Sequence, residues 1–382
     1  MAGKRKIFED VSADAGSSPA QPQPQPGMLS QGDAKGRGLV RAWLFVLGLM
    51  VVAMILVGGL TRLTDSGLSI TEWKPITGAL PPLSAEAWDG EFAKYQEIPE
   101  FELQNQDMTL EEFKTIYWWE WGHRQLGRVI GLVWAAGFAG FYFTKQIPNG
   151  WTGRLLTLGG LGALQGAIGW WMVSSGLSGR MVDVASYRLA VHLGLAFAIL
   201  GCIAWYIMLL SREARDLMTA RRAREAKLSG MSTGLMHFAM LQILLGALVA
   251  GIDAGRNFPE WPLMAGGIFP PDIFALSPWW SNFFENAGLV QFIHRLSAYL
   301  LLGFGVAIWM KARKSGNGAI RTAFHLAGGL LVLQVIIGIG TVVHAAPLHW
   351  AVIHQFTAIL LWVSIVNARF NAFYPIAQSV RN

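Results

Sequence analysis

The chain has 382 residues, of which 53% are hydrophobic and 14% are charged, with a formal net charge of +6. Soluble domains usually carry about 25% charged residues, so this composition excludes an ordinary soluble protein and indicates a multi-pass membrane protein. Its basic residues alternate from loop to loop instead of forming one patch, which favours a lipid bilayer and not a nucleic acid as partner. The single cysteine, Cys202, excludes an intrachain disulfide and a thiolate metal cluster.

Residues 1–38 are predicted to be a disordered cytoplasmic tail. They contain a Gln-Pro repeat between Gln21 and Pro26, scattered charges and few apolar residues. The apolar segment of a signal peptide is missing, and the acidic residues Glu9 and Asp10 argue against a mitochondrial presequence. We therefore expect a protein of the bacterial inner membrane.

Eight apolar segments follow, each long enough to cross a bilayer of roughly 30 Å as an α-helix. Basic residues concentrate in the tail and in the loops after the fourth and sixth segments, which predicts that these regions and both termini are cytoplasmic. The acidic loop 61–117 then lies on the periplasmic side. The spans are expected at 41–60, 120–143, 154–173, 188–210, 232–250, 289–310, 322–343 and 350–369.

The two halves of the chain resemble each other. The sequence from Leu164-Gln165 to Gly169 matches the sequence from Leu333-Gln334 to Gly338. We therefore predict an all-α polytopic membrane protein whose eight transmembrane helices form two duplicated four-helix bundles. The expected boundaries are the tail (1–38), an N-terminal bundle (39–215), a cytoplasmic linker (216–231), a C-terminal bundle (232–372) and a cytoplasmic C-terminal tail (373–382).

Four histidines lie at matched places, each near the start of a span that enters from the periplasmic side. They are His123, His192, His294 and His354. Two imidazoles on facing helices, with no cysteine and no carboxylate cluster nearby, are typical of axial ligands to haem iron. We therefore predict one haem site per half, both towards the periplasmic side of the membrane.

Residues near these histidines fit a flat, charged ligand. Arg124, Arg128 and Arg295 are predicted to pair with haem propionates, although each could instead reach lipid phosphates. Two further membrane histidines, His237 and His325, are expected to form hydrogen bonds between helices. Small residues that leave room for a macrocycle are Gly127, Gly131, Gly162, Gly166 and Gly169.

The two halves differ three residues before the first histidine of each pair. Glu120 precedes His123, whereas Gln291 precedes His294. Residues three apart share a helix face, so we predict that Glu120 is a catalytic carboxylate, acting as a general base or stabilising a cationic intermediate. The alternative is a structural ion pair between Glu120 and Arg124.

Two external segments complete the expected sites. Thr61, Arg62 and Asp65, at the end of the first span, could also meet the first site. Tryptophan and proline residues at 73–75 and 261–262 are predicted to form rigid, non-helical covers over the two sites.

Taken together, GGLTRLTDSGLSITEWKPITGALPP, YWWEWGHRQLGRVIG, FIHR and AVIHQ resemble the haem A synthase family, and the resemblance extends from about residue 40 onward. It implies that His123 and His192 flank the substrate haem O beside Glu120, and that His294 and His354 ligate a haem b cofactor. The implied reaction oxidises the C8 methyl of haem O to a formyl group by successive hydroxylations. Water is the expected oxygen source, and the product is haem A for cytochrome oxidase.

The missing cysteine pair in the first external loop places the chain with the cysteine-free alphaproteobacterial and mitochondrial type. The expected partners are haem O, haem O synthase and cytochrome oxidase assembly factors. Electrons are expected to leave through the C-terminal haem to an acceptor that the sequence does not identify. The oligomeric state, including a homo-oligomer, is left open.

Two other functions are weighed against this one. A di-haem membrane electron-transfer cytochrome b would also fit four histidines, but a pure electron carrier does not need the difference between Glu120 and Gln291. A di-iron carboxylate site would need a second Glu-x-x-His motif, which the sequence lacks.

Overall fold

The computed structural model describes residues 28–179 and 181–377, with side chains from residue 36 onward. In this part of the chain there are twelve α-helices, three short 3-10 helices and one isolated β-bridge, so the predicted all-α class is confirmed. Residues 1–27 of the expected N-terminal tail and residues 378–382 of the C-terminal tail lie outside the described residues. The first helix already begins at Met28, within the segment expected to be disordered.

Each of the eight predicted spans lies within a long helix. Seven of these helices are long and apolar enough to cross a membrane, which identifies a multi-pass membrane protein. The exception is α5, whose glycines, two tryptophans and Gln165 lower its mean hydropathy. The long helices are α1 (Met28–Leu63), α4 (Leu110–Phe143), α5 (Thr152–Val173), α6 (Ser186–Leu210), α8 (Ala226–Gly251), α10 (Ala287–Ala312), α11 (Gly318–Val343) and α12 (Leu348–Phe373).

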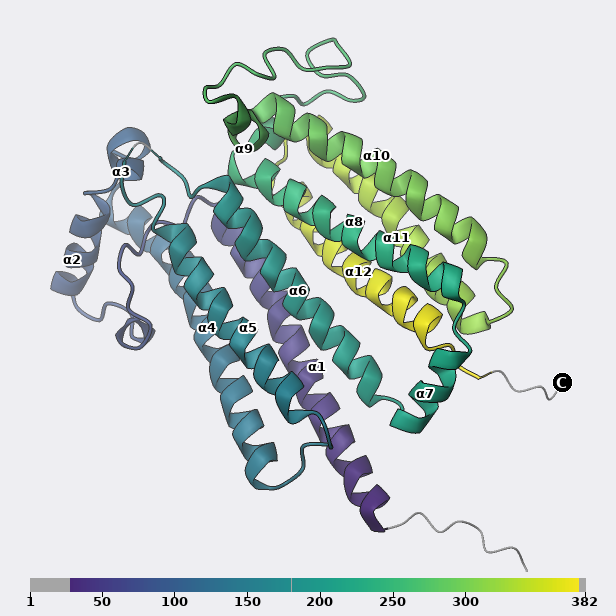
Figure 1. Cartoon of the computed structure of the whole chain (residues 1–382). Helices are drawn as coiled ribbons and strands as arrows, with labels where there is room; N and C mark the ends of the chain where they lie inside the picture. Colours follow the sequence, from purple (N-terminus) through teal and green to yellow (C-terminus); the bar gives the residue numbers. More distant parts are fainter. Residues whose placement is uncertain (1–27, 180, 378–382) are drawn as a thin grey trace, which may run out of the picture.

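Short helices fill the longer connections. Figure 1 shows α2, α3 and α9 at one end of the molecule and α7 at the other. The expected linker 216–231 is largely helical, because α7 and the start of α8 occupy most of it. The short elements are η1 (Thr77–Ala79), α2 (Ala85–Tyr95), α3 (Pro99–Gln104), α7 (Ala214–Arg222), η2 (Ala254–Arg256), η3 (Trp279–Ser281) and α9 (Asn282–Glu285).

Helix α4 begins in the external loop, well before the predicted span. Thr109 accepts a hydrogen bond from the backbone of Glu112, and the Glu112 side chain accepts one from the backbone of Thr109. This capping box satisfies backbone donors that a helix start leaves without partners, and the acidic first turn suits the positive end of the helix dipole. The helix can therefore start outside the apolar region and continue through it to Phe143.

The long helices form two rings of four. In the first ring α1 packs on α4 and α6, and α5 packs on α4 and α6; in the second, α8 and α11 each pack on α10 and α12. The rings meet where α6 lies against α8 and α12, and where α1 lies against α12 (Figure 1). Because lipid is as apolar as the side chains, close packing and hydrogen bonds between helices stabilise such contacts.

Polar contacts join the two halves. Within the apolar region, the Trp362 indole donates to the Phe197 carbonyl at 2.8 Å, and the Gln355 amide donates to the Ile55 carbonyl at 2.8 Å. At the end of α1, Arg62 forms ion pairs with Asp65 at 2.7 Å and Asp253 at 2.9 Å. Arg62 was expected to meet the first histidine site, but its guanidinium instead ties α1 to the segment after α8.

The external loop before α4 buries an acidic side chain. Glu100, in α3, is 2% exposed, and among the described residues its Oε2 atom has no hydrogen-bond partner. The pKa of Glu100 is raised from 4.5 to about 8; burial is the main cause, the negative charges of Asp183, Glu120 and Asp65 add to it, and Arg62 opposes it. The folded protein therefore holds this carboxyl in its neutral form at neutral pH.

We expect this burial to make the protein less stable as the pH rises. Between pH 4.5 and about 8 the folded state binds a proton at Glu100 that the unfolded state has released, so the free energy of unfolding falls across this range. Thermal unfolding in detergent should show a midpoint lower at pH 8.5 than at pH 6, by on the order of a few degrees. Glu100→Gln should reduce this difference, and an unchanged pH dependence in that variant would contradict the assignment.

Candidate functional site

The structure brings together the two pairs of histidines that the sequence predicts. His123 lies on α4 and His192 on α6, which are opposite members of the first ring; His294 on α10 and His354 on α12 are opposite members of the second. The two histidines of each pair therefore come from helices that face each other across the ring. All four helices start at the end of the molecule that carries α2, α3 and α9, so the histidines lie towards that end (Figure 1).

Each imidazole lies against a glycine of a neighbouring helix. A Cβ atom at any of these glycines would come too close to the histidine Cε1 atom, so a larger residue would push the ring away. The distances from this Cβ position are 2.8 Å for Gly58 and His123, 2.9 Å for Gly169 and His192, 3.1 Å for Gly246 and His294, and 3.1 Å for Gly338 and His354. The contact between a site histidine and a glycine of the neighbouring helix is therefore present twice in each half of the chain.

Three of the four histidines also contact a glutamine one helical turn before that glycine. In each case the amide Nε2 donates to the histidine backbone carbonyl and lies within hydrogen-bond distance of the imidazole. The distances to the carbonyl are 3.0 Å for Gln165 and His192, 3.0 Å for Gln242 and His294, and 3.1 Å for Gln334 and His354. His123 is the exception, because the residue one turn before Gly58 is Met54.

Glu120 is buried, and hydrogen-bond donors hold both of its carboxylate oxygens. Oε2 accepts from the Ser69 hydroxyl at 2.8 Å and from the Ile70 backbone N–H at 2.7 Å, and Oε1 accepts from Arg124 at 2.5 Å. The expected ion pair with Arg124 is therefore present, and the carboxylate has a fixed orientation next to the external loop. Its counterpart Gln291 is also buried, and its amide donates to the Phe258 carbonyl at 3.4 Å.

The three arginines of the predicted site bind backbone carbonyls of the external loops. Arg124 donates to Ile70 at 2.7 Å and to Glu72 at 3.0 Å. Arg128 donates to the carbonyls of Pro75 and Lys74, and Arg295 donates to those of Phe258 and Leu263. The arginines thus hold each loop on the helix that carries the first histidine of its pair. Their pairing with haem propionates stays a prediction.

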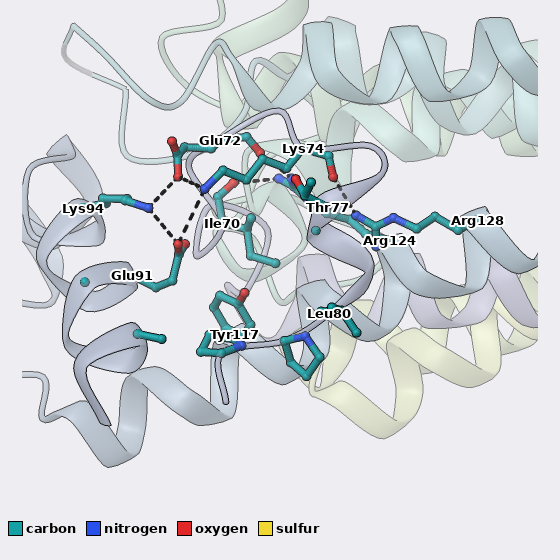
Figure 2. A pocket seen from close by; sticks show the side chains of 15 residues that line it. Ile70, Glu72, Lys74, Thr77, Leu80, Glu91, Lys94, Tyr117, Arg124 and Arg128 are labelled. Atoms are coloured by element: carbon teal, nitrogen blue, oxygen red, sulfur yellow. Dashed lines mark hydrogen bonds and ion pairs between the residues drawn. The ribbon is translucent and has the colours of Figure 1, made fainter. Parts of the chain in front are cut away.

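A cavity of about 370 Å³ opens between this first loop and α4. Figure 2 shows Lys94 between Glu72 and Glu91, while Arg124 and Arg128 point from α4 towards the loop. The Lys94 ammonium lies 2.6 Å from Glu72 and 2.7 Å from Glu91. Residues 73–75 are non-helical, as expected, and Lys74 lines this cavity; a role of the segment as a cover over the histidine site stays a prediction.

The glycines expected to leave room for a macrocycle differ in their surroundings. Gly131, Gly162 and Gly166 are exposed, and a Cβ atom at any of them would meet no other atom within 4 Å, so these positions of α4 and α5 are open. The Met54 methyl group lies 3.5 Å from the Cβ position of Gly127. The facing imidazoles fit an iron macrocycle, which His123 and His192, or His294 and His354, would hold.

The two remaining membrane histidines behave differently from each other. His325 accepts a hydrogen bond from the Trp309 indole on the neighbouring helix at 2.8 Å, as predicted. His237 lies 2.8 Å from the Thr233 carbonyl of its own helix, so the expected contact between helices is replaced by one within α8. Among the described residues, neither contacts a glutamine and a glycine in the way that His192, His294 and His354 do.

Comparison with known proteins identifies the family. Residues 41–366 match the family model COX15-CtaA, described as cytochrome oxidase assembly protein. The chain belongs to this family. Similar proteins named Heme A synthase include those of Ruegeria sp. (strain TM1040), 61% identical over 99% of both chains, and Ruegeria pomeroyi, 59% identical over the full length of both. The protein of that name from Paracoccus denitrificans is 57% identical over 99% of this chain and 98% of its own.

The sequence did not predict Gln165, Gln242 and Gln334 as site residues, and of the glycines that contact the histidines it indicated only Gly169. The sequence from Gln165 to Gly169 and its match from Gln334 to Gly338 indicated the duplication but not the contact with histidine. A search for Gln-x-x-x-Gly would also have found Gln242 and Gly246, which complete the set.

Proposed function

We propose that the chain is a haem A synthase, which oxidises the C8 methyl of haem O to a formyl group and supplies haem A for cytochrome oxidase. The observation that carries this proposal is the full-length similarity to proteins of that name, at 52–61% identity. A di-haem electron-transfer cytochrome b is not favoured, because the relatives share the whole chain and the two halves differ at Glu120 and Gln291.

The two histidine pairs are assigned different ligands. His123 and His192 would hold the iron of haem O, the substrate, next to Glu120. His294 and His354 would hold a resident haem b, which supplies a one-electron redox centre when it is bound. This assignment of the two ligands rests on Glu120. It places a carboxylate in the first ring, whereas Gln291 occupies the equivalent position in the second.

The oxidation balances if water supplies the oxygen. Methyl and water give the alcohol with loss of two electrons and two protons; a second round gives the hydrated aldehyde, which loses water to leave the formyl group. Protons must therefore leave the methyl carbon and the incoming water. Glu120 would accept them as a general base, with Ser69 and Arg124 fixing its orientation. The electrons would leave through the redox centre that haem b supplies at His294 and His354, to an acceptor outside this chain.

The membrane arrangement follows from the charge pattern of the loops. Eight spans in two duplicated four-helix bundles would place both termini in the cytoplasm, in the bacterial inner membrane, with both sites near the periplasmic face. Haem O would come from haem O synthase, and haem A would pass to cytochrome oxidase assembly factors. Lateral entry from the bilayer suits the isoprenoid tail of haem O.

Complementation tests the proposal. The chain would be expressed in a bacterium that makes haem O but has lost its own haem A synthase. Extracted membrane haems are then separated by chromatography and identified by mass. Haem A or its hydroxylated precursor is expected, whereas unchanged haem O despite membrane-inserted protein would support an electron carrier.

A further inference from the structure

Three of the four site histidines contact both a glutamine and a glycine of a neighbouring helix, whereas in the fourth case a methionine replaces the glutamine. On α5, α8 and α11, a glutamine and a glycine four residues later both touch a site histidine. Helix α1 supplies the fourth set, in which Gly58 touches His123 but Met54 stands where the glutamine would be. Met54 faces the same region, because its methyl group approaches Gly127, one turn after His123 on α4.

The hydrogen-bond pattern follows this substitution. The Nδ1 atom of His123 is buried and has no hydrogen-bond partner among the residues that the structure describes. By contrast, the Nδ1 atoms of His192, His294 and His354 lie 3.2, 3.0 and 3.2 Å from a glutamine amide. A methionine sulfur is only a weak acceptor, so His123 lacks the fixed polar partner of the other three.

The three glutamines also have an unused acceptor. The Oε1 atoms of Gln165, Gln242 and Gln334 are buried and, within the described part of the chain, accept no hydrogen bond. An imidazole that binds metal through one nitrogen almost always donates its other N–H to a nearby acceptor, which fixes the ring and strengthens the ligand. The amide that carries each Oε1 already lies 3.0–3.2 Å from the Nδ1 atom of its histidine, so Oε1 is the nearby acceptor for an Nδ1–H.

We propose that Gln165, Gln242 and Gln334 are positioning residues that stabilise three axial histidines, and that Met54 leaves His123 as the exchangeable ligand of the substrate site. This inference rests on the proposed function. A resident haem must be retained at both ligands, whereas a substrate haem must be released after oxidation. One unsupported ligand on the substrate haem lets the product leave, and His192 still orients it.

Haem dissociation tests this assignment without relying on turnover. Purified protein is loaded with haem O and haem b, kept without an electron acceptor, and mixed with excess haem-free myoglobin. Loss of each haem is followed by extraction and chromatography, so the two sites are measured in one sample. We expect Met54→Gln to slow haem O loss, and Gln334→Met to speed haem b loss, each by roughly 10–100-fold with the other haem unaffected.

A double variant that exchanges the residues at positions 54 and 165 tests whether the glutamine acts by positioning a histidine or only by packing. In Met54→Gln with Gln165→Met, the unsupported ligand moves from His123 to His192, and the rate of haem O loss should return towards that of the unmodified protein. Gln355→Met is the matched control, since Gln355 lies beside His354 in sequence but bonds the Ile55 carbonyl. It should leave both haem losses unchanged.

The results distinguish this inference from the proposed function. Unaltered haem O loss in Met54→Gln, or unaltered haem b loss in Gln334→Met, would overturn the inference even if the protein converts haem O. If both losses shift as expected but no haem O is converted, the ligand assignment stands and the proposed function fails.

Discussion

Glu120→Gln is expected to abolish formyl formation while haem binding is retained. The substitution removes the carboxylate but keeps its size, and the second half carries glutamine at the equivalent position, Gln291, so the fold accommodates an amide there. Loss of a general base costs roughly 10²–10⁴-fold in rate. The measurement is the yield of haem A and of its hydroxylated precursor per bound haem O in membranes that contain equal amounts of protein.

The ion pair with Arg124 makes a second variant necessary, because Glu120 also helps to hold the external loop. Ser69→Ala removes one donor to the same carboxylate and leaves the charge in place. We expect this variant to keep most of the activity. An equal loss in Ser69→Ala and Glu120→Gln would assign Glu120 to loop structure, and full activity in Glu120→Gln would exclude any role in the oxidation.

His294→Ala is expected to remove the low-spin haem b spectrum and to leave haem O bound. Its imidazole and that of His354 come from the facing helices α10 and α12 and lie against Gly246 and Gly338, and an alanine would remove one of the two side chains that would hold the iron. His123→Ala should have the opposite effect, with haem b retained and haem O binding weakened. Absorption spectra of the reduced protein and the mass of extracted haems measure both.

The matched control is the membrane histidine His325, which bonds Trp309 and has no glutamine or glycine partner of the repeated kind in the described structure. His325→Phe should keep both haems. Loss of haem b in this variant as complete as in His294→Ala would mean that the spectrum reports general damage to the second ring and not loss of a ligand.

The sequence predicted the spans and the histidine pairs because both leave local signals. A span needs a continuous apolar segment, and a duplication copies each histidine with its neighbours, so His123 and His294 could be matched from His-Arg alone. The span 120–143 was predicted, but the start of its helix at Leu110 was not, since the first turns lie in polar sequence and depend on the Thr109 capping box.

The polar contacts across the rings could not be predicted in this way. Gln165 and Gln334 were recognised as repeated residues, but their histidine partners lie on other helices, and sequence alone does not give the rotation of one helix against another. The same reason applies to Arg62, whose partner Asp253 belongs to the other half. The pairing of Glu120 with Arg124 was foreseen because residues four apart on a helix are neighbours.

We propose that the first histidine pair holds a haem that is chemically changed, whereas the second pair holds a haem that is not. The most direct measurement supplies haem O to the purified protein with an artificial electron acceptor, extracts the haems at intervals and determines their masses. Haem O is expected to decline as its hydroxylated form and then haem A rise, while haem b stays constant. Bound haem O that keeps its mass throughout, in protein that retains haem b, would contradict it.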